Sequence, residues 1–530
     1  MSFLLCKGLQ LDRQPSPPLI ISRLMQKHWA LLIAVSMASL MQHSLLADAL
    51  NPAITAPALE PAPLGQAPTA SAGAGLANDW LRDESFLFNP WDLGGQFRAR
   101  LEIKDNFATP GQPGQVDFRK NGGDANNTYL LLRQRVHVGY NSDWFSAFVE
   151  GQESSSTGDK RNPNLESDLF DLHQAYVNLG NLQQFPLTAK VGRQELAYGD
   201  ERLVGAFDWN NIGRVFDAVK LRYQDENFWV DTFASRVVIP RDNEFDTSND
   251  YDFLSGIYGS TRNLLPWQDT QIYFLARNVS EGSPNFETGA LVPLASPRDI
   301  YTPGFRLKSL PGQLAGWDYT LEAAYQFGRF AGVSGAAPAA VVGKSFSHEA
   351  YAAHLDGGYT WTNVIAAPRL GFEANYASGD SDPNDDKHGT FDTLFPTGHA
   401  FSGVMDFYSW QNIQDVRINL ILKPIKKLTV ATSFRGVWLA DTADSFYQAN
   451  TVARSGGTVG GHDGYAKNPG YDSFVGTELD LLITYSVMKF ATVQGGYGHF
   501  FIGDYVKQSF SGGIGSTDAD YVYLQAKIVF

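Results

Sequence analysis

Short segments in which apolar and polar residues alternate recur from residue 91 to the end of this chain. In LTAKV, residues 187–191, the first, third and fifth residues are apolar, and Thr188 and Lys190 stand between them. Successive side chains of a β-strand point to opposite faces, so this period of two predicts strands with one apolar and one polar face. The pattern is compatible with a soluble sandwich, in which the apolar face would pack in a core and the polar face would meet water. It is equally compatible with an outer-membrane barrel, whose apolar face contacts lipid and whose polar face lines a wet lumen.

The lengths of the connections between these segments distinguish a barrel from a sandwich. About eighteen segments start near residues 92, 128, 143, 169, 187, 213, 228, 252, 269, 302, 316, 347, 365, 413, 427, 473, 489 and 520. Every second connection is short, as in NSD, DEN and SVM, and those between are long, as in residues 379–412 and 440–472. Outer-membrane barrels alternate in this way, whereas a sandwich has no reason to do so. We therefore expect an all-β fold, a transmembrane antiparallel β-barrel of about 18 strands with short periplasmic turns and long extracellular loops.

The N-terminal region has the features of an export signal. Lys27 and His28 precede an apolar run at residues 29–41, and Ala47-Asp48-Ala49 follows it. A charged start, a short apolar run and an A-x-A site are typical of a secretory signal. A short anchor helix is the alternative, but the run falls below the roughly 18 residues of a helical span.

These features divide the chain into three parts. Residues 1–49 are expected to be an N-terminal extension and signal peptide, with Met25 as a candidate start. Residues 50–90 are rich in Ala and Pro and are expected to form a periplasmic lead-in. Residues 91–530 are expected to form one barrel domain, since cutting a closed barrel would open two edges in lipid.

Composition excludes several classes of function. The chain has 41 Lys and Arg against 56 Asp and Glu, a net charge of −15, so nucleic acid is not an expected partner. Its single cysteine, Cys6, precedes the expected cleavage site, which leaves the mature chain without a disulfide or a cysteine metal site. Asp380, Asp382, Asn384 and Asp386 alternate as at the start of a calcium loop, but Asp385 replaces its glycine and Phe391 its final glutamate. We predict no metal and no cofactor.

Catalytic motifs are also absent from the sequence. It contains no G-x-S-x-G, no H-E-x-x-H and no phosphate loop, so we predict no catalytic residues and no enzyme activity. A barrel esterase with a Ser and His pair at its rim remains the alternative, because such partners need not be close in sequence.

The C-terminal segment has an apolar face that ends in an aromatic residue. Val522, Leu524, Ala526, Ile528 and Phe530 lie on one face of the expected last strand. A terminal aromatic of this kind resembles the assembly signal of outer-membrane barrels. We therefore expect the barrel-assembly machinery and outer-membrane lipid among the partners.

Four longer stretches resemble the alginate export family of outer-membrane proteins. They are FDLHQAYVNLG (170–180), VGRQELAYGDERLVGAFDWNNIGRVFDAVKLRY (191–223), FEANYASGDSDPNDDKHGTFDTLFPTGHAFSG (372–403) and MDFYSWQNIQDVRINL (405–420). The resemblance covers roughly residues 90–530. It implies a monomeric barrel of about eighteen strands in the cell outer membrane, which exports an anionic polysaccharide through an arginine-lined lumen. The family is broad, so membership does not fix the polymer.

The polar faces of the expected strands provide candidate lumen residues. Our registers place roughly fifteen basic and nine acidic residues there, although acids outnumber bases in the whole chain. The candidates for the translocation lumen are Arg98, Arg100, Arg133, Arg135, Arg193, Arg222, Arg369 and Arg435. Arg193 joins them only if a bulge near Gly192 resets the strand register. A basic lining would favour transit of a polyanion, and the alternative is that lumen bases and acids simply pair with each other.

The stretch after residue 198 is a candidate pore-mouth loop. It contains Asp200, Arg202, Asp208, Trp209, Asn210 and Arg214. Mixed charge with Trp and Asn suits sugar hydrogen bonding and stacking in a loop folded into the pore, and a plain surface loop is the equal alternative.

The function predicted from these observations is a channel that exports an anionic, alginate-like exopolysaccharide. A general or substrate-specific uptake porin for small anions or sugars is the alternative. A periplasmic export partner is a further candidate partner.

Overall fold

The computed structural model describes residues 76–106, 118, 126–160, 166–242, 244–284, 295–331, 344–451, 453–454, 465, 467–510 and 516–530. The expected signal and most of the expected lead-in, residues 1–75, lie outside this part. The remainder of the lead-in contains the helix α2 (Leu76–Glu84) and the 3-10 helix η1 (Phe86–Phe88). Within the described residues, no helix combines the length and apolar character that a helical membrane span requires.

In the part of the chain that the structure describes, nineteen strands form one sheet that closes on itself. The first nine are β1 (Trp91–Asp105), β2 (Asn127–Asn141), β3 (Phe145–Thr157), β4 (Asp168–Leu179), β5 (Leu187–Gln194), β6 (Phe216–Gln224), β7 (Phe228–Ile239), β8 (Thr247–Thr261) and β9 (Gln268–Val279). The others are β10 (Arg298–Ser309), β11 (Trp317–Ala331), β12 (Ser345–Thr360), β13 (Arg369–Ala377), β14 (Lys387–His388), β15 (Ile413–Ile425), β16 (Leu428–Leu439), β17 (Phe474–Met488), β18 (Ala491–Ile502) and β19 (Ala519–Val529).

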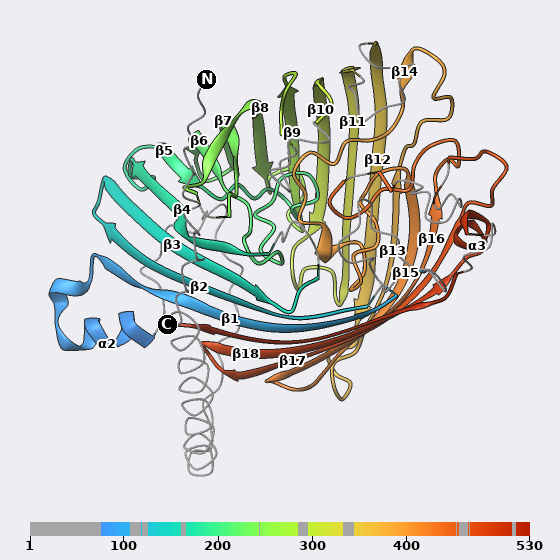
Figure 1. Ribbon diagram of the computed structural model, residues 1–530. Helices are drawn as coiled ribbons and strands as arrows, with labels where there is room; N and C mark the ends of the chain where they lie inside the picture. The colour runs from blue at the N-terminus through green and yellow to red at the C-terminus, as the bar shows by residue number, and fades with distance from the viewer. Residues whose placement is uncertain are drawn as a thin grey trace, which may run out of the picture. The chain divides into compact units, whose positions relative to one another are not determined.

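Eighteen of these strands make the wall, because β14 spans only two residues and pairs in parallel with β12. The wall strands pair antiparallel in chain order, and β1 pairs with both β2 and β19. The blue strand β1 therefore lies beside the red C-terminal strands in Figure 1, where the sheet closes. The predicted barrel of about eighteen strands is confirmed. All eighteen predicted starts lie within five residues of the observed ones, the largest difference being at β8.

The predicted alternation of short and long connections is also confirmed. The β2–β3, β6–β7, β15–β16 and β17–β18 turns occupy residues 142–144, 225–227, 426–427 and 489–490. The connections at the other end include residues 195–215, 378–412 and 440–473. We call the two ends of the barrel the short-turn end and the long-loop end.

The two faces of the wall differ as the alternation predicts. On β2, Leu130, Val136 and Val138 are exposed, whereas Arg133 and Arg135 are buried. Apolar side chains therefore cover the outside, where a bilayer would contact them, and charged side chains point inward.

Two long loops fold into the barrel, although residues 381–387 of the second remain largely exposed. They span residues 195–215 and 378–412, and the second contains β14 and the 3-10 helix η3 (Gly398–Ala400). Leu196, Leu203 and Phe395 from these loops belong to one buried cluster with wall residues such as Leu254 and Tyr258. A further helix, α3 (Asp504–Ser509), follows β18 at the long-loop end. The apolar core is thus built from loop and inward wall residues together.

The bulge expected near Gly192 is absent. β5 pairs with β4 and with β6 without a register shift through Gly192, which adopts a φ of +125°. The break in the sequence pattern instead marks the end of β5 at Gln194, after which the chain turns into the lumen. Leu196 and Tyr198 are buried there by loop packing, not by a new strand register.

Candidate functional site

The first inward loop, residues 195–215, is fixed to several sides of the wall. Asp200 accepts hydrogen bonds from Arg306 of β10 at 2.5 and 2.9 Å, and also from Lys308 at 2.9 Å. Arg202 donates to Glu373 of β13 at 3.3 Å. Burial opposes ionisation of Asp200, but the Arg306 and Lys308 cations hold its pKa at about 2. The loop therefore crosses the lumen on charged contacts that persist at any working pH.

The second inward loop, residues 378–412, meets the first inside the barrel. Val204 and Phe395 form a parallel bridge, in which Gly205 N donates to the Phe395 carbonyl at 2.8 Å. Arg214 donates to the Pro396 carbonyl at 2.9 Å. Asp392 anchors this loop to the wall through Arg277, with Arg298 adding a second contact. Together the two loops form a plug across the lumen, which we call the loop plug.

The tip of the first loop places one carboxylate among cations from three adjacent strands. Arg133 of β2 donates to Asp208 Oδ1 at 2.7 Å, while Arg135 of β2 and Lys527 of β19 lie 3.5 and 3.8 Å from its oxygens. Arg98 of β1 donates to the Asp208 carbonyl at 2.6 Å. Burial opposes ionisation, but the arginines keep the pKa of Asp208 well below its usual range. Its side chain is still 47% exposed, so this anion site faces open space.

An aromatic stack lies directly beside this carboxylate. The Trp209 ring packs between Arg100, whose guanidinium carbon is 3.8 Å from the ring centroid, and His399, stacked at 3.6 Å. Tyr523 of β19 meets the same indole edge-on. The neighbouring Asn210 side chain accepts hydrogen bonds from backbone amides of its own loop. The stack joins both loops of the plug to the wall near β1.

Three other predicted lumen arginines face inward and are held by carboxylates. Arg222 makes a two-pronged contact with Asp231, at 2.5 and 2.9 Å. Arg369 donates to Asp318 and to Asp356 at 2.5 and 2.9 Å. Arg435 is completely buried and pairs with Asp415 and with the hydroxyl of Tyr408. Most of the predicted arginines therefore position loops or neutralise acids, in addition to setting the potential of the lumen.

Arg193 is not on the inward face. Arg193 follows the exposed Val191 by two residues on β5, so the two share a face of the strand. Its register partner on β6 is Asp217, which precedes the exposed Val219 by two residues. Arg193 donates to both carboxylate oxygens of Asp217. A third bond reaches the Asp246 carbonyl. Because the expected bulge is absent, Arg193 keeps the phase of Val191 and lies on the outer side of β5.

The sequence tally missed several inward acids. Asp92, Asp168, Asp171, Asp252, Asp269 and Asp415 also lie on inward faces, together with one further base, Arg298. Among the described wall residues, sixteen inward bases therefore face fifteen inward acids. The alternation of apolar and polar residues did not assign these acids to the inward face because they lie at strand ends or beside bulges. There the alternating stretch is too short or changes phase.

The inward charges are nevertheless unevenly distributed around the wall. The faces of β19 and β1–β7, which we call the basic sector, carry nine bases and six acids. The bases are Arg98, Arg100, Lys104, Arg133, Arg135, Lys190, Lys220, Arg222 and Lys527, and the acids are Asp92, Glu102, Glu150, Asp168, Asp171 and Asp231. The remaining described wall carries seven bases and nine acids. The anion site at Asp208 lies in the basic sector.

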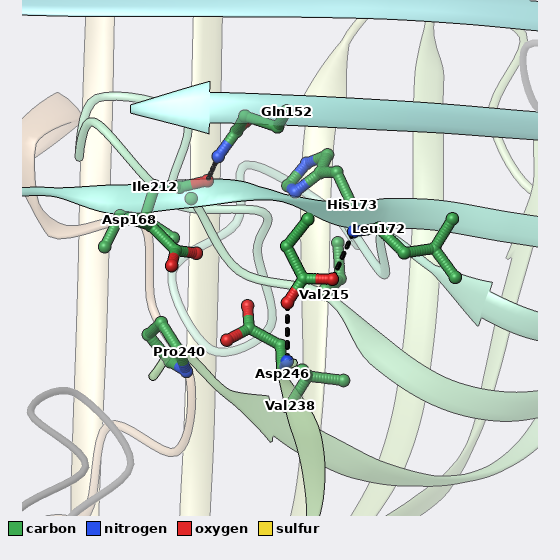
Figure 2. Close-up of a pocket in the computed structure, with 11 residues that line it drawn as sticks. Gln152, Asp168, Leu172, His173, Ile212, Val215, Val238, Pro240 and Asp246 are labelled. Atoms are coloured by element: carbon green, nitrogen blue, oxygen red, sulfur yellow. Dashed lines mark hydrogen bonds between the residues drawn. The ribbon is translucent and has the colours of Figure 1, made fainter. Parts of the chain in front are cut away.

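A small enclosed pocket lies where β4 meets the loop before β8. Figure 2 shows the Asp168 and Asp246 carboxylates together in it, with His173 and Gln152 along another side. Asp246 N donates to Asp171 Oδ2. Burial raises the pKa of Asp246 to about 6, and the nearby Asp171 adds to the shift. In the described ranges, no group of three or more His, Cys, Asp or Glu is arranged to hold a metal ion.

Comparison with known proteins identifies one matching family and a set of solved structures with a similar fold. The model of a family described as alginate export matches residues 89–512. The Pseudomonas aeruginosa channel OccK1 (OpdK) superposes with a TM-score of 0.51 at 9% identity, covering 83% of this chain and 98% of its own. OpdK with vanillate gives 0.50 at 9% identity, with the same coverage. Acinetobacter baumannii OccAB4 gives 0.49 at 10% identity, covering 82% and 98%. No curated protein sequence matches the chain.

Proposed function

This chain belongs to the alginate export family and is an outer-membrane channel, and on that basis we propose that it exports an anionic polysaccharide. The substrate class would be a polymer whose sugars carry carboxylates. It would pass from the periplasm through the barrel, along the basic sector and past the loop plug. Supply of polymer on the periplasmic side would drive the movement, since a passive conduit provides no energy of its own.

The observation that carries this proposal is the anion site at Asp208. A carboxylate is held there by Arg133 and Arg135 of β2 and by Lys527 of β19, the two strands that flank β1 in the closed wall. The planar fork of arginine matches carboxylate geometry and keeps its charge at any working pH. The same cations would attract the carboxylates of a passing uronate chain. Trp209 beside them is itself stacked between Arg100 and His399, so it holds the loop that carries the carboxylate in place.

The test is ion selectivity and polymer block in a planar bilayer. Replacing Arg133 and Arg135 with glutamine should shift the reversal potential toward cation preference and weaken block by an acidic polysaccharide. The shift should be larger at about 0.1 M salt than at 1 M, because the screening length falls from about 10 to 3 Å. Arg236→Gln is the matched control, since Arg236 is half exposed and pairs with Asp250 on the outer face.

Loss of these arginines would also loosen the loop that carries Asp208, and a second variant separates the two effects. Asp208→Asn releases the same loop but removes a negative charge. It should therefore shift selectivity toward anions, opposite to the arginine variant. If the arginine variant and Asp208→Asn shift the reversal potential equally and in the same direction, the cause is the loosened loop and not the lumen charge. A cation-selective wild-type pore would contradict export of a polyanion.

Uptake of small anions or sugars is the second candidate function. The loop plug favours it, because two loops that bond to each other inside the barrel leave less room for a polymer. The solved structure of OpdK with vanillate shows that a barrel of this fold holds a small aromatic acid. Permeation of small carboxylates without any block by the polymer would favour this reading.

A further inference from the structure

The segment before the barrel is tied to the short-turn end by polar contacts. In α2, Asn78 donates to Asp92 at 2.7 Å and accepts from the backbone amide of Leu93 at 2.7 Å. Arg82 donates to the Trp91 carbonyl at 3.0 Å. Asp79 accepts from Lys489, in the β17–β18 turn, at 2.7 Å. These contacts reach from the start of β1 to a turn two strands away, so they fix α2 at the rim (Figure 1).

The side of this segment that faces away from the barrel carries three large, exposed apolar side chains. Trp80 is 61% exposed, and Phe86 and Leu87 in η1 are 77% and 67% exposed. An α-helix turns about 100° per residue, so Trp80 lies roughly 200° from both Asn78 and Arg82. The indole therefore points away from the contacts with β1. Ser85 caps η1 by accepting from Leu87 N at 3.3 Å, which holds the two apolar side chains of η1 in a defined turn.

The same rim carries an exposed aromatic girdle on the barrel wall. Trp91 meets Tyr140 edge-on with ring centroids 5.1 Å apart, and both are exposed. Trp144 and Phe145, at the β2–β3 turn, are exposed as well. Aromatic residues gather at the level of the lipid head groups in membrane proteins. The chain reaches Trp91 directly from η1, so the apolar surface of α2 and η1 continues the surface that lipid covers.

We propose that α2 and η1 form an interfacial anchor, in which Trp80, Phe86 and Leu87 insert into the periplasmic leaflet of the outer membrane. A short segment whose polar contacts hold it to the barrel and whose large apolar side chains are free is suited to this position. Its own affinity for lipid need not be high, because attachment to the barrel keeps it at the bilayer surface. The exposed Asp83 and Glu84 flank Trp80 on the same face of α2 and would lie at the level of the lipid head groups. This anchor would work whichever substrate the channel carries.

The experiment places an environment-sensitive dye on the segment and on a turn of the same rim. Phe86→Cys and, in the exposed β6–β7 turn, Glu226→Cys are made in mature protein, whose expected sequence has no other cysteine, and labelled with NBD. Both proteins are reconstituted in phosphatidylethanolamine and phosphatidylglycerol vesicles. At position 86 the emission should shift to the blue and be quenched by lipids that carry a shallow spin label. At position 226 it should instead be quenched by aqueous iodide.

Two further outcomes keep the proposal testable. Equal iodide quenching at positions 86 and 226 in vesicles would overturn it. If position 86 is shielded only in native outer membranes and not in vesicles, a periplasmic protein covers the segment, and the lipid assignment is wrong. To avoid dependence on the dye, a variant with Trp80, Phe86 and Leu87 all changed to glutamine is digested with trypsin in vesicles. Cleavage after Arg82 should increase strongly over the wild type, while the barrel remains heat-modifiable.

Discussion

At the scale of single residues, charge in this barrel acts mainly through pairing. Arg435 and Asp415 are both buried and hold each other, and Arg222 holds Asp231 in the same way. Removing one partner of such a pair leaves an uncompensated charge, which typically costs 3–5 kcal/mol of stability. Asp208 differs, because its carboxylate is held by cations and yet is half exposed. That difference separates a residue that stabilises the wall from one whose place a substrate carboxylate would take under the proposed function.

Asp246 gives a pH-dependent prediction. Its folded pKa of about 6 lies above its ordinary value of 3.8, chiefly because of burial and then because of Asp171, with Arg193 acting in the opposite sense. The protonated form is therefore favoured by folding. The stabilisation is complete below about pH 4 and is lost as the pH rises through about 6.

We expect the midpoint of thermal unfolding to fall between pH 5 and pH 8 in the wild type, and to fall less in Asp246→Asn. The asparagine oxygen can still accept the backbone bond from Arg241 N, so the loop should keep its conformation. Asp250→Asn, at an exposed carboxylate, should behave like the wild type. An identical pH dependence in Asp246→Asn would show that this group does not titrate in the range.

At the scale of elements, the strands could be predicted from the sequence and the loops could not. A period of two is a local property, and it placed the start of β5 at Leu187 and of β15 at Ile413. The inward fold of residues 195–215 depends on contacts with strands far along the chain, such as Arg306 and Glu373. No local pattern contains that information. The phase break near Gly192 therefore predicts a bulge from local pattern alone, whereas in the structure it marks the point where the chain leaves the wall.

The loop plug can be tested by a reversible crosslink. Val204 and Phe395 bridge the two inward loops, and paired residues of neighbouring strands are close enough for a disulfide. We expect the Val204→Cys and Phe395→Cys double variant to form one under oxidation. It should leave the small-ion conductance nearly unchanged but stop release of polymer, and a reductant should restore release. Each single variant is the control. Unimpaired release through the oxidised channel would mean that the plug need not open.

At the scale of the whole molecule, closure of the sheet gives every wall strand a hydrogen-bonding partner on both sides. The C-terminal Phe530 exchanges backbone hydrogen bonds with Gly95, at 2.9 and 3.0 Å, and so joins the last residue to the first strand. Every wall strand then has two neighbours, which a strand in lipid requires because no water is present to satisfy its backbone. Nothing in this closure fixes which end faces the cell exterior. The alternation of connections does, since the long loops of such barrels are extracellular.

The orientation of the barrel can be measured with two matched cysteines. Asp385 lies in the long connection that contains β14, and Asp143 lies in the β2–β3 turn, and both are exposed aspartates. On intact cells, Asp385→Cys should react with a membrane-impermeant maleimide, whereas Asp143→Cys should react only after the outer membrane is opened. The reagent must be larger than the path through the loop plug, or it would reach both sites. If only Asp143→Cys reacts on intact cells, the short-turn end faces the cell exterior and the assigned orientation is wrong. The export direction proposed for the channel would then lose its structural basis.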